Sequence, residues 1–263
     1  MVTKDWQACP IDMSDLDLSG ENLRQHWDEL HAGNREAFPE HESLQEAWRC
    51  YHLGDFAKAV NIGLEMGGEG TVPAAFAGTI YAQYIEQDEG KKSEIFKAVM
   101  DWCEKAIADG HSSANLHYIF AVAMGRYSQF ISMIEALAQG FGGRMKEQVD
   151  RCIELDDEHA EGHVTLGAWN AELSDKAGAM MAKMLYGATK DGAFENYDRA
   201  LAIAPDSPVP YIEYAAGLEI LFGDAKKDEV IARLEAAMEK PAVDAMQRLD
   251  QEKARKHLVT LKA

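Results

Sequence analysis

The stretch Ala193-Phe-Glu-Asn-Tyr197-Asp-Arg-Ala200-Leu-Ala-Ile-Ala-Pro205 decides the fold of this 263-residue chain. Ala193, Tyr197 and Ala200 follow one another at spacings of four and three, which places them on one face of a helix. Pro205 cannot continue a helix and marks its end. The stretch therefore predicts a helix whose packing face alternates small and aromatic side chains.

The region around this stretch is one of three copies of a repeated pattern. In each copy an apolar helix ends, a short loop follows and a second helix begins, with an aromatic or histidine residue four positions before a small one. The small residue lets a neighbouring helix approach closely, and the residue one turn earlier packs on the same face. The copies run from Glu104–Ile107 through His117 to Ala121, from Asp150–Ile153 through His163 to Gly167, and from Asp198–Leu201 through Tyr211 to Ala215.

The spacing A-x3-Y-x2-A-x4-P from Ala193 to Pro205 resembles the second helix of a tetratricopeptide repeat, and Leu166-Gly167 fits the first helix. Weaker copies stand at 53–60 and 234–241, so the resemblance covers roughly residues 44–241. It implies an all-α fold: one α-α superhelix, or tetratricopeptide-like solenoid, of four to five helix pairs.

Two copies are longer than a standard repeat. Gly167 and Ala193 are 26 positions apart, where a standard repeat has about 12, and the copy that starts at Ala121 has a similar excess. Residues 116–137 and 164–185 contain few helix breakers, so we expect two elongated helical hairpins whose first helices are lengthened. Such helices would wall a deeper groove.

The chain ends are expected to cap the stack. Leu23, Trp27 and Leu30 predict an amphipathic helix over residues 20–33, and Ala242, Met246 and Leu249 indicate a final helix. We expect a loosely ordered N-terminal segment, 1–19, followed by a single repeat domain, 20–263, with helical caps.

Composition limits the partners. The formal net charge of -19 disfavours nucleic acid and anionic membranes. It fits an acidic, soluble surface, and the alternative is a groove that steers a basic protein partner. The N-terminus has no secretory signal and no stretch is apolar enough to cross a membrane, so a cytoplasmic protein is expected. The four cysteines are far apart and are expected to be reduced thiols.

The segment His159-Ala-Glu-Gly-His163 invites a zinc reading. A metalloprotease box needs glutamate directly after the first histidine, whereas Glu161 is two positions on and points away. His159 aligns with Ser113 and Ser207, where a helix cap is expected, and His163 aligns with the packing residue Tyr211. We therefore expect a capping and a packing histidine, with no metal, no cofactor and no catalytic residue.

Partner contacts are expected from a few polar and aromatic side chains. Arg126, Tyr127 and Gln129, in the first insertion, suit a peptide backbone or carboxylate. Glu172, Lys176 and Tyr186, in and around the second insertion, complete the predicted site, and Lys183 and Arg199 are similar but weaker candidates.

A closer resemblance lies between residues 145 and 240. His163-Val-Thr-Leu-Gly-Ala-Trp169 with Glu172, then Tyr186-Gly187 and the Ala193–Pro205 helix, resembles the C-terminal half of the regulator of microtubule dynamics family and is similar to uncharacterised bacterial tetratricopeptide proteins. The resemblance implies a helical protein that binds partners and brings no catalytic residues.

The leading functional hypothesis is a non-catalytic protein-interaction module with a partner helix or peptide in its concave groove. The alternative is a small-molecule binder with a pocket between the elongated helices. A metal-dependent enzyme is the third reading.

Overall fold

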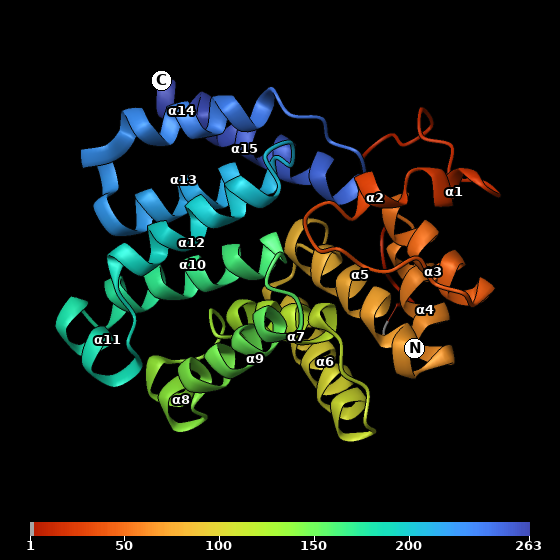
Figure 1. The fold of residues 1–263 in the computed structure, drawn as a ribbon, viewed down its shortest axis with the longest axis horizontal. Coiled ribbons are helices and arrows are strands. Elements are labelled where there is room, and N and C mark those ends of the chain that lie inside the picture. The colour runs from red at the N-terminus through yellow and green to blue at the C-terminus, as the bar shows by residue number, and fades with distance from the viewer. Residues whose placement is uncertain (1–2) are drawn as a thin grey trace.

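The computed structural model describes residues 3–263. Within these residues every regular element is a helix (Figure 1). Ten helices form five antiparallel pairs, and we call the first of each pair inner and the second outer. The pairs are α3 (Glu42–His52) with α4 (Phe56–Met66), α5 (Thr71–Tyr84) with α6 (Glu89–Ala108), α7 (Ala114–Tyr127) with α9 (Phe141–Leu155), α10 (Ala160–Lys176) with α12 (Lys190–Ile203), and α13 (Val209–Phe222) with α14 (Lys227–Met238).

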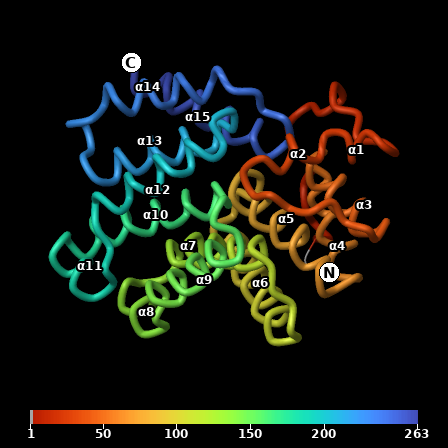
Figure 2. Tube along the Cα trace, in the orientation of Figure 1, coloured from red at the N-terminus to blue at the C-terminus, as the bar shows by residue number. Residues whose placement is uncertain are grey.

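The inner helices contact one another in chain order, from α3 through α5, α7 and α10 to α13. The last helix, α15 (Ala245–Lys262), contacts α13, α14 and also α3, at the opposite end of the chain. Figure 2 shows this return of α15 towards the N-terminal elements. The predicted all-α superhelix is therefore confirmed, and its last helix joins its first pair.

The stretch from Ala193 to Pro205 forms α12 as predicted, and its packing face lies in the core. Ala193, Tyr197 and Ala200 are all buried. A Cβ on Gly167 of α10 would lie 2.8 Å from Tyr197 Cε1, and one on Gly217 of α13 would lie 2.5 Å from Tyr197 Cε2. The Tyr197 ring thus fills the junction of three helices, and the two glycines leave room for it.

The expectation of two lengthened first helices is wrong. The inserted segments are where the sequence placed them, but each forms a separate short helix: α8 (Met133–Ala138) and α11 (Ala179–Tyr186). The Ser128 hydroxyl donates to the Gly125 carbonyl at the end of α7, and Ser132 caps α8. Gly178 separates α10 from α11. Its φ of 77° is a backbone conformation that an L-residue adopts only with strain.

The N-terminal cap is divided where the sequence predicted one helix. α1 (Asn22–Gln25) and α2 (Trp27–Leu30) are four-residue pieces joined at His26. The three predicted apolar residues of this cap, Leu23, Trp27 and Leu30, are buried as expected.

Residues 3–19 precede this cap and form no regular helix, and residues 1–2 lie outside the described residues. Trp6 stacks on Tyr81 with ring centroids 3.9 Å apart, and Leu18 is buried in the main core. The segment is thereby held against α5 and the first pair.

Candidate partner-binding site

His159 caps α10, as its alignment with Ser113 predicts. Its Nδ1 accepts a hydrogen bond from the Gly162 backbone N–H at 2.9 Å, and Ser113 caps α7 through the Leu116 N–H in the same way. His163 lies one turn further along, between the Asn196 side chain and the Asp157 carbonyl, both at 3.0 Å. Both histidines are therefore committed to bonds within the fold.

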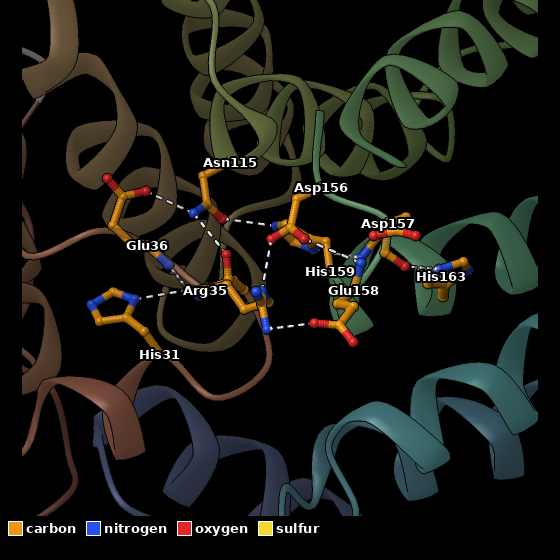
Figure 3. A network of polar contacts seen from close by, with 11 residues as sticks. His31, Arg35, Glu36, Asn115, Asp156, Asp157, Glu158, His159 and His163 are labelled. Carbon is orange, nitrogen blue, oxygen red and sulfur yellow. Dashed lines mark hydrogen bonds and ion pairs between the residues drawn. The ribbon is translucent and has the colours of Figure 1, made fainter. Parts of the chain in front are cut away.

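A polar network fixes the tautomer of His159 (Figure 3). The Asn115 amide nitrogen donates to the Asn34 carbonyl and to Glu36 Oε2, so its Oδ1 must accept from His159 Nε2 at 3.0 Å. His159 is then neutral, with a proton on Nε2 alone. Burial agrees with this state, because it lowers the pKa of His159 to about 4.

The zinc reading finds no geometry to support it in the described part of the chain. No three side chains of histidine, cysteine, aspartate or glutamate among residues 3–263 come together in a way that could hold a metal ion. The four cysteines are free thiols there, and burial raises the pKa of Cys50 to about 11.

Polar side chains from four inner helices and from α15 form a cluster that includes Arg126. Its Nη2 lies 3.8 Å from Glu213 Oε1 of α13, and it is under the electrostatic influence of Tyr84 and Asp250. The Tyr84 hydroxyl of α5 donates to the Asp250 carboxyl of α15. We call this group, with Tyr118 of α7 and Glu161 of α10, the inner polar cluster.

The cluster combines charge with partial access to solvent. The side chains of Arg126 and Glu213 are 30% and 28% exposed. A distance of 3.8 Å is long for a guanidinium–carboxylate pair, so several Arg126 donors remain free for an additional acceptor.

Acids outnumber bases in the inner polar cluster. Glu213 and Asp250 lie near the Arg126 guanidinium, and Glu161 lies near Asp250. Lys253, at the edge of the cluster, also acts on Asp250, so three carboxyl groups face two cationic side chains. Burial raises the pKa of Asp250 to about 7; the Tyr84 hydrogen bond, Lys253 and Arg126 oppose this rise, and Glu213 adds to it. Burial likewise raises the pKa of Glu161 to about 7, and its Oε2 has no hydrogen-bond partner among the described residues. An additional positive charge would stabilise both as carboxylates.

The raised pKa of Glu161 gives a pH-dependent contribution to stability. A carboxyl with a folded-state pKa of about 7 binds more protons when folded than when unfolded, so its contribution is full below about pH 4.5 and is lost as the pH rises through 7. Replacing Glu161 with Gln removes this titration. Between pH 5 and pH 8 we expect the variant to gain about 2–3 kcal/mol relative to the wild-type protein. Urea unfolding at several pH values measures it, and equal pH slopes for the two proteins would refute it.

The predicted site residues lie in several places. Arg126 belongs to the inner polar cluster, whereas Tyr127 packs beside Phe141 with ring centroids 5.9 Å apart. Gln129 is exposed in the turn after α7. The Glu172 and Lys176 side chains form an ion pair on α10, and Glu172 also acts electrostatically on Tyr197.

Tyr186, the last residue of α11, lies against Gly142 at the start of α9 and edge-on to Trp169. Of the six predicted residues, only Glu172 and Lys176 form an ion pair with each other. Of the two weaker candidates, Lys183 lies exposed on α11 and Arg199 lies exposed on α12.

Five members of the inner polar cluster were missed as site residues from the sequence: Tyr84, Tyr118, Glu161, Glu213 and Asp250. Each comes from a different helix, and no spacing along the chain connects them. Glu161 offered no signal in the sequence, because an acidic residue at the start of a helix is expected at the surface, whereas the structure buries it.

Fold and cluster together define a helical-repeat protein of paired helices, and the comparisons with known proteins agree. The family model described as regulator of microtubule dynamics protein 1-3 matches residues 73–262. The chain belongs to the regulator of microtubule dynamics family.

Curated relatives share part of their sequence with the chain. It is 29% identical over 126 residues to regulator of microtubule dynamics protein 3 of Mus musculus, which is 46% of this chain and 26% of the relative. The proteins of the same name from Rattus norvegicus and Bos taurus are each 27% identical, over 129 and 127 residues, again about half of this chain and about a quarter of theirs. No helix in residues 3–263 is long and apolar enough to span a membrane.

Proposed function

We propose that the chain is a non-catalytic protein-interaction module that holds a basic segment of a protein partner against the inner polar cluster. The observation that carries this proposal is the excess of carboxyl groups in the cluster, two of which, Glu213 and Asp250, lie near an arginine whose one ion pair within residues 3–263 is long. A lysine or arginine of the partner would lie near Glu213 and Asp250, and Arg126 would donate to a backbone carbonyl or a carboxylate. The net charge of -19 steers such a partner towards the chain.

The family supports a role through protein partners. The relatives are named as regulators of microtubule dynamics, and the aligned part covers about a quarter of their length. We propose that this chain contributes partner binding to such a role as a single repeat domain over residues 20–263. Its placement in the cytoplasm stays a prediction from the sequence.

The small-molecule alternative has lost its main support. It required a pocket between two lengthened first helices, and both insertions form separate short helices instead. One cavity of about 230 Å³ lies near the first insertion, between α6, α7 and α9, and is lined by Glu104, Arg144 and Gln148 among others. It lies away from the inner polar cluster, so the protein partner is the better-supported proposal.

Replacing Arg126 with Ala tests the proposal. Partners captured by the wild-type protein should be recovered at least about tenfold less by the variant, because its free donors are lost. The melting temperature should fall by only a few degrees, since the single ion pair of Arg126 within residues 3–263 is long and partly exposed. The measurement is quantitative affinity capture from the native host, with thermal unfolding of both proteins.

Arg151→Ala is the matched control, because Arg151 lies exposed on the outer helix α9 in an ion pair with Glu154. It should leave capture unchanged. Equal capture by the Arg126 variant and the control would refute the proposed role of the cluster. A collapse of stability on replacing Arg126 would show instead that this side chain holds the fold.

A further inference from the structure

The two inserted helices expose most of the large apolar side chains on the described surface. Seven such side chains are more than half exposed within residues 3–263, and six of them lie on α8 and α11. Their exposed fractions range from 58% to 82%, and the six are Met133, Ile134, Leu137, Met180, Met184 and Leu185. α8 buries none of its own residues and α11 buries only Ala182. Exposed apolar surface on this scale marks an interaction site.

Both helices adjoin the N-terminal end of α9. α8 packs on α9 and joins it through Gly140, while Tyr186 of α11 lies against Gly142. The Trp169 indole N–H of α10 donates to the Gly142 carbonyl of α9 at 2.9 Å, and the Trp169 ring lies edge-on to Tyr186 of α11. Figure 1 shows α8 and α11 at the same edge of the molecule. We call their exposed apolar surface the insertion patch.

The charge of the insertion patch differs from that of the rest of the chain. α8 carries one charged residue, Glu135, and α11 carries one, Lys183. Neither forms an ion pair with another residue of the described chain. The patch is thus neutral on a chain whose net charge is -19, and its two unpaired charges have opposite signs.

We propose that the insertion patch is a dimerisation surface whose partner is a second copy of this chain. A two-fold axis through the patch would set α8 of one copy against α11 of the other, and would pair Glu135 with Lys183 twice. Strongly charged copies repel each other, so a neutral patch is where two of them can meet with least repulsion. The methionines provide apolar side chains that adapt to each other.

This occupant fits better than a membrane or a charged partner. A helix that lies on an anionic membrane is rich in lysine and arginine on its polar face, and the two helices together offer one cation. A strongly acidic or basic partner would find only one opposite charge here. A second copy satisfies both charges and covers both apolar faces.

Charge exchange at the two positions tests the dimer. Sedimentation equilibrium of the full chain, from about 1 to 200 µM, should show the mass rising from 29.1 kDa towards twice that value. Lys183→Glu alone and Glu135→Lys alone should each weaken association at least about tenfold, because each sets like charges opposite one another twice. The variant that carries both changes should return to within about threefold of the wild-type constant.

Controls change the same properties elsewhere. Lys91→Glu changes an exposed lysine of α6 and alters the net charge as Lys183→Glu does. Val259→Asp changes an exposed apolar residue of α15 and so matches Ile134→Asp. Of the two aspartate variants, only Ile134→Asp should abolish association. A monomer at every concentration would overturn the proposal. So would an association constant that Lys183→Glu and Ile134→Asp leave unchanged, or single charge reversals that the combined variant does not rescue.

Discussion

Replacing Tyr197 with alanine is expected to lower the free energy of unfolding by about 3–5 kcal/mol. The ring is buried where α10, α12 and α13 meet, close against the glycines Gly167 and Gly217. Alanine leaves a cavity that cannot collapse, because the two glycines have no side chains to move into it. Urea unfolding followed by circular dichroism measures the change.

Tyr197→Phe is the control, because it keeps the ring and removes only the hydroxyl. It should cost less than about 1 kcal/mol. A cost below about 1.5 kcal/mol for the alanine variant would show that this ring does not hold the three helices together.

Replacing Asp244 with alanine is expected to cost about 3–5 kcal/mol, because it breaks a buried carboxyl–imidazole contact between α15 and the first helix pair and leaves His52 without this partner. Asp244 Oδ2 lies 2.9 Å from His52 Nδ1 of α3, and both side chains are buried. The His52 Nε2 lies 3.1 Å from His31 Nε2, whose ring also contacts Asn34. Asp244 also caps α15 through the Gln247 N–H, so the variant loses that cap as well.

Thermal unfolding and amide hydrogen exchange across α15 measure this loss. Asp15→Ala is the matched control, since Asp15 also joins the N-terminal segment to α15, through Arg248, but is largely exposed. It should cost less than about 1 kcal/mol. Similar costs for the two variants would contradict the closure of the superhelix by Asp244 and His52.

The repeat pattern predicted much of the fold because it is a local signal. Tyr197 with the small residues Gly167 and Ala193 encodes the close contact of α10 and α12, and Ser113 and His159 encode two helix starts. The lengths of the inserted helices could not be read in the same way. Serine and a single glycine are tolerated inside many helices, and here the hydrogen bond of Ser128 and the positive φ of Gly178 end α7 and α10.

Less of the candidate site could be predicted. Arg126 was predicted because Arg126, Tyr127 and Gln129 together suit recognition of a peptide backbone or carboxylate, but the surroundings of Arg126 depend on contacts distant in sequence. Glu213 is 87 residues further along the chain, and Asp250 reaches the cluster only because α15 returns towards the first pair. Such long-range closure leaves no periodic signal in the sequence.

Photo-crosslinking from position 253 tests the central claim most directly. Lys253 of α15 is exposed, and its ammonium lies 5.6 Å from the ring centroid of Tyr84 at the edge of the inner polar cluster. A benzophenone residue there should crosslink a protein partner from the native host, through a peptide rich in lysine or arginine, and Arg126→Ala should abolish the crosslink. The same probe at Lys105 on outer helix α6 should give none. Crosslinks of equal yield at the two positions, or a crosslink at 253 that Arg126→Ala leaves intact, would contradict binding at the inner polar cluster.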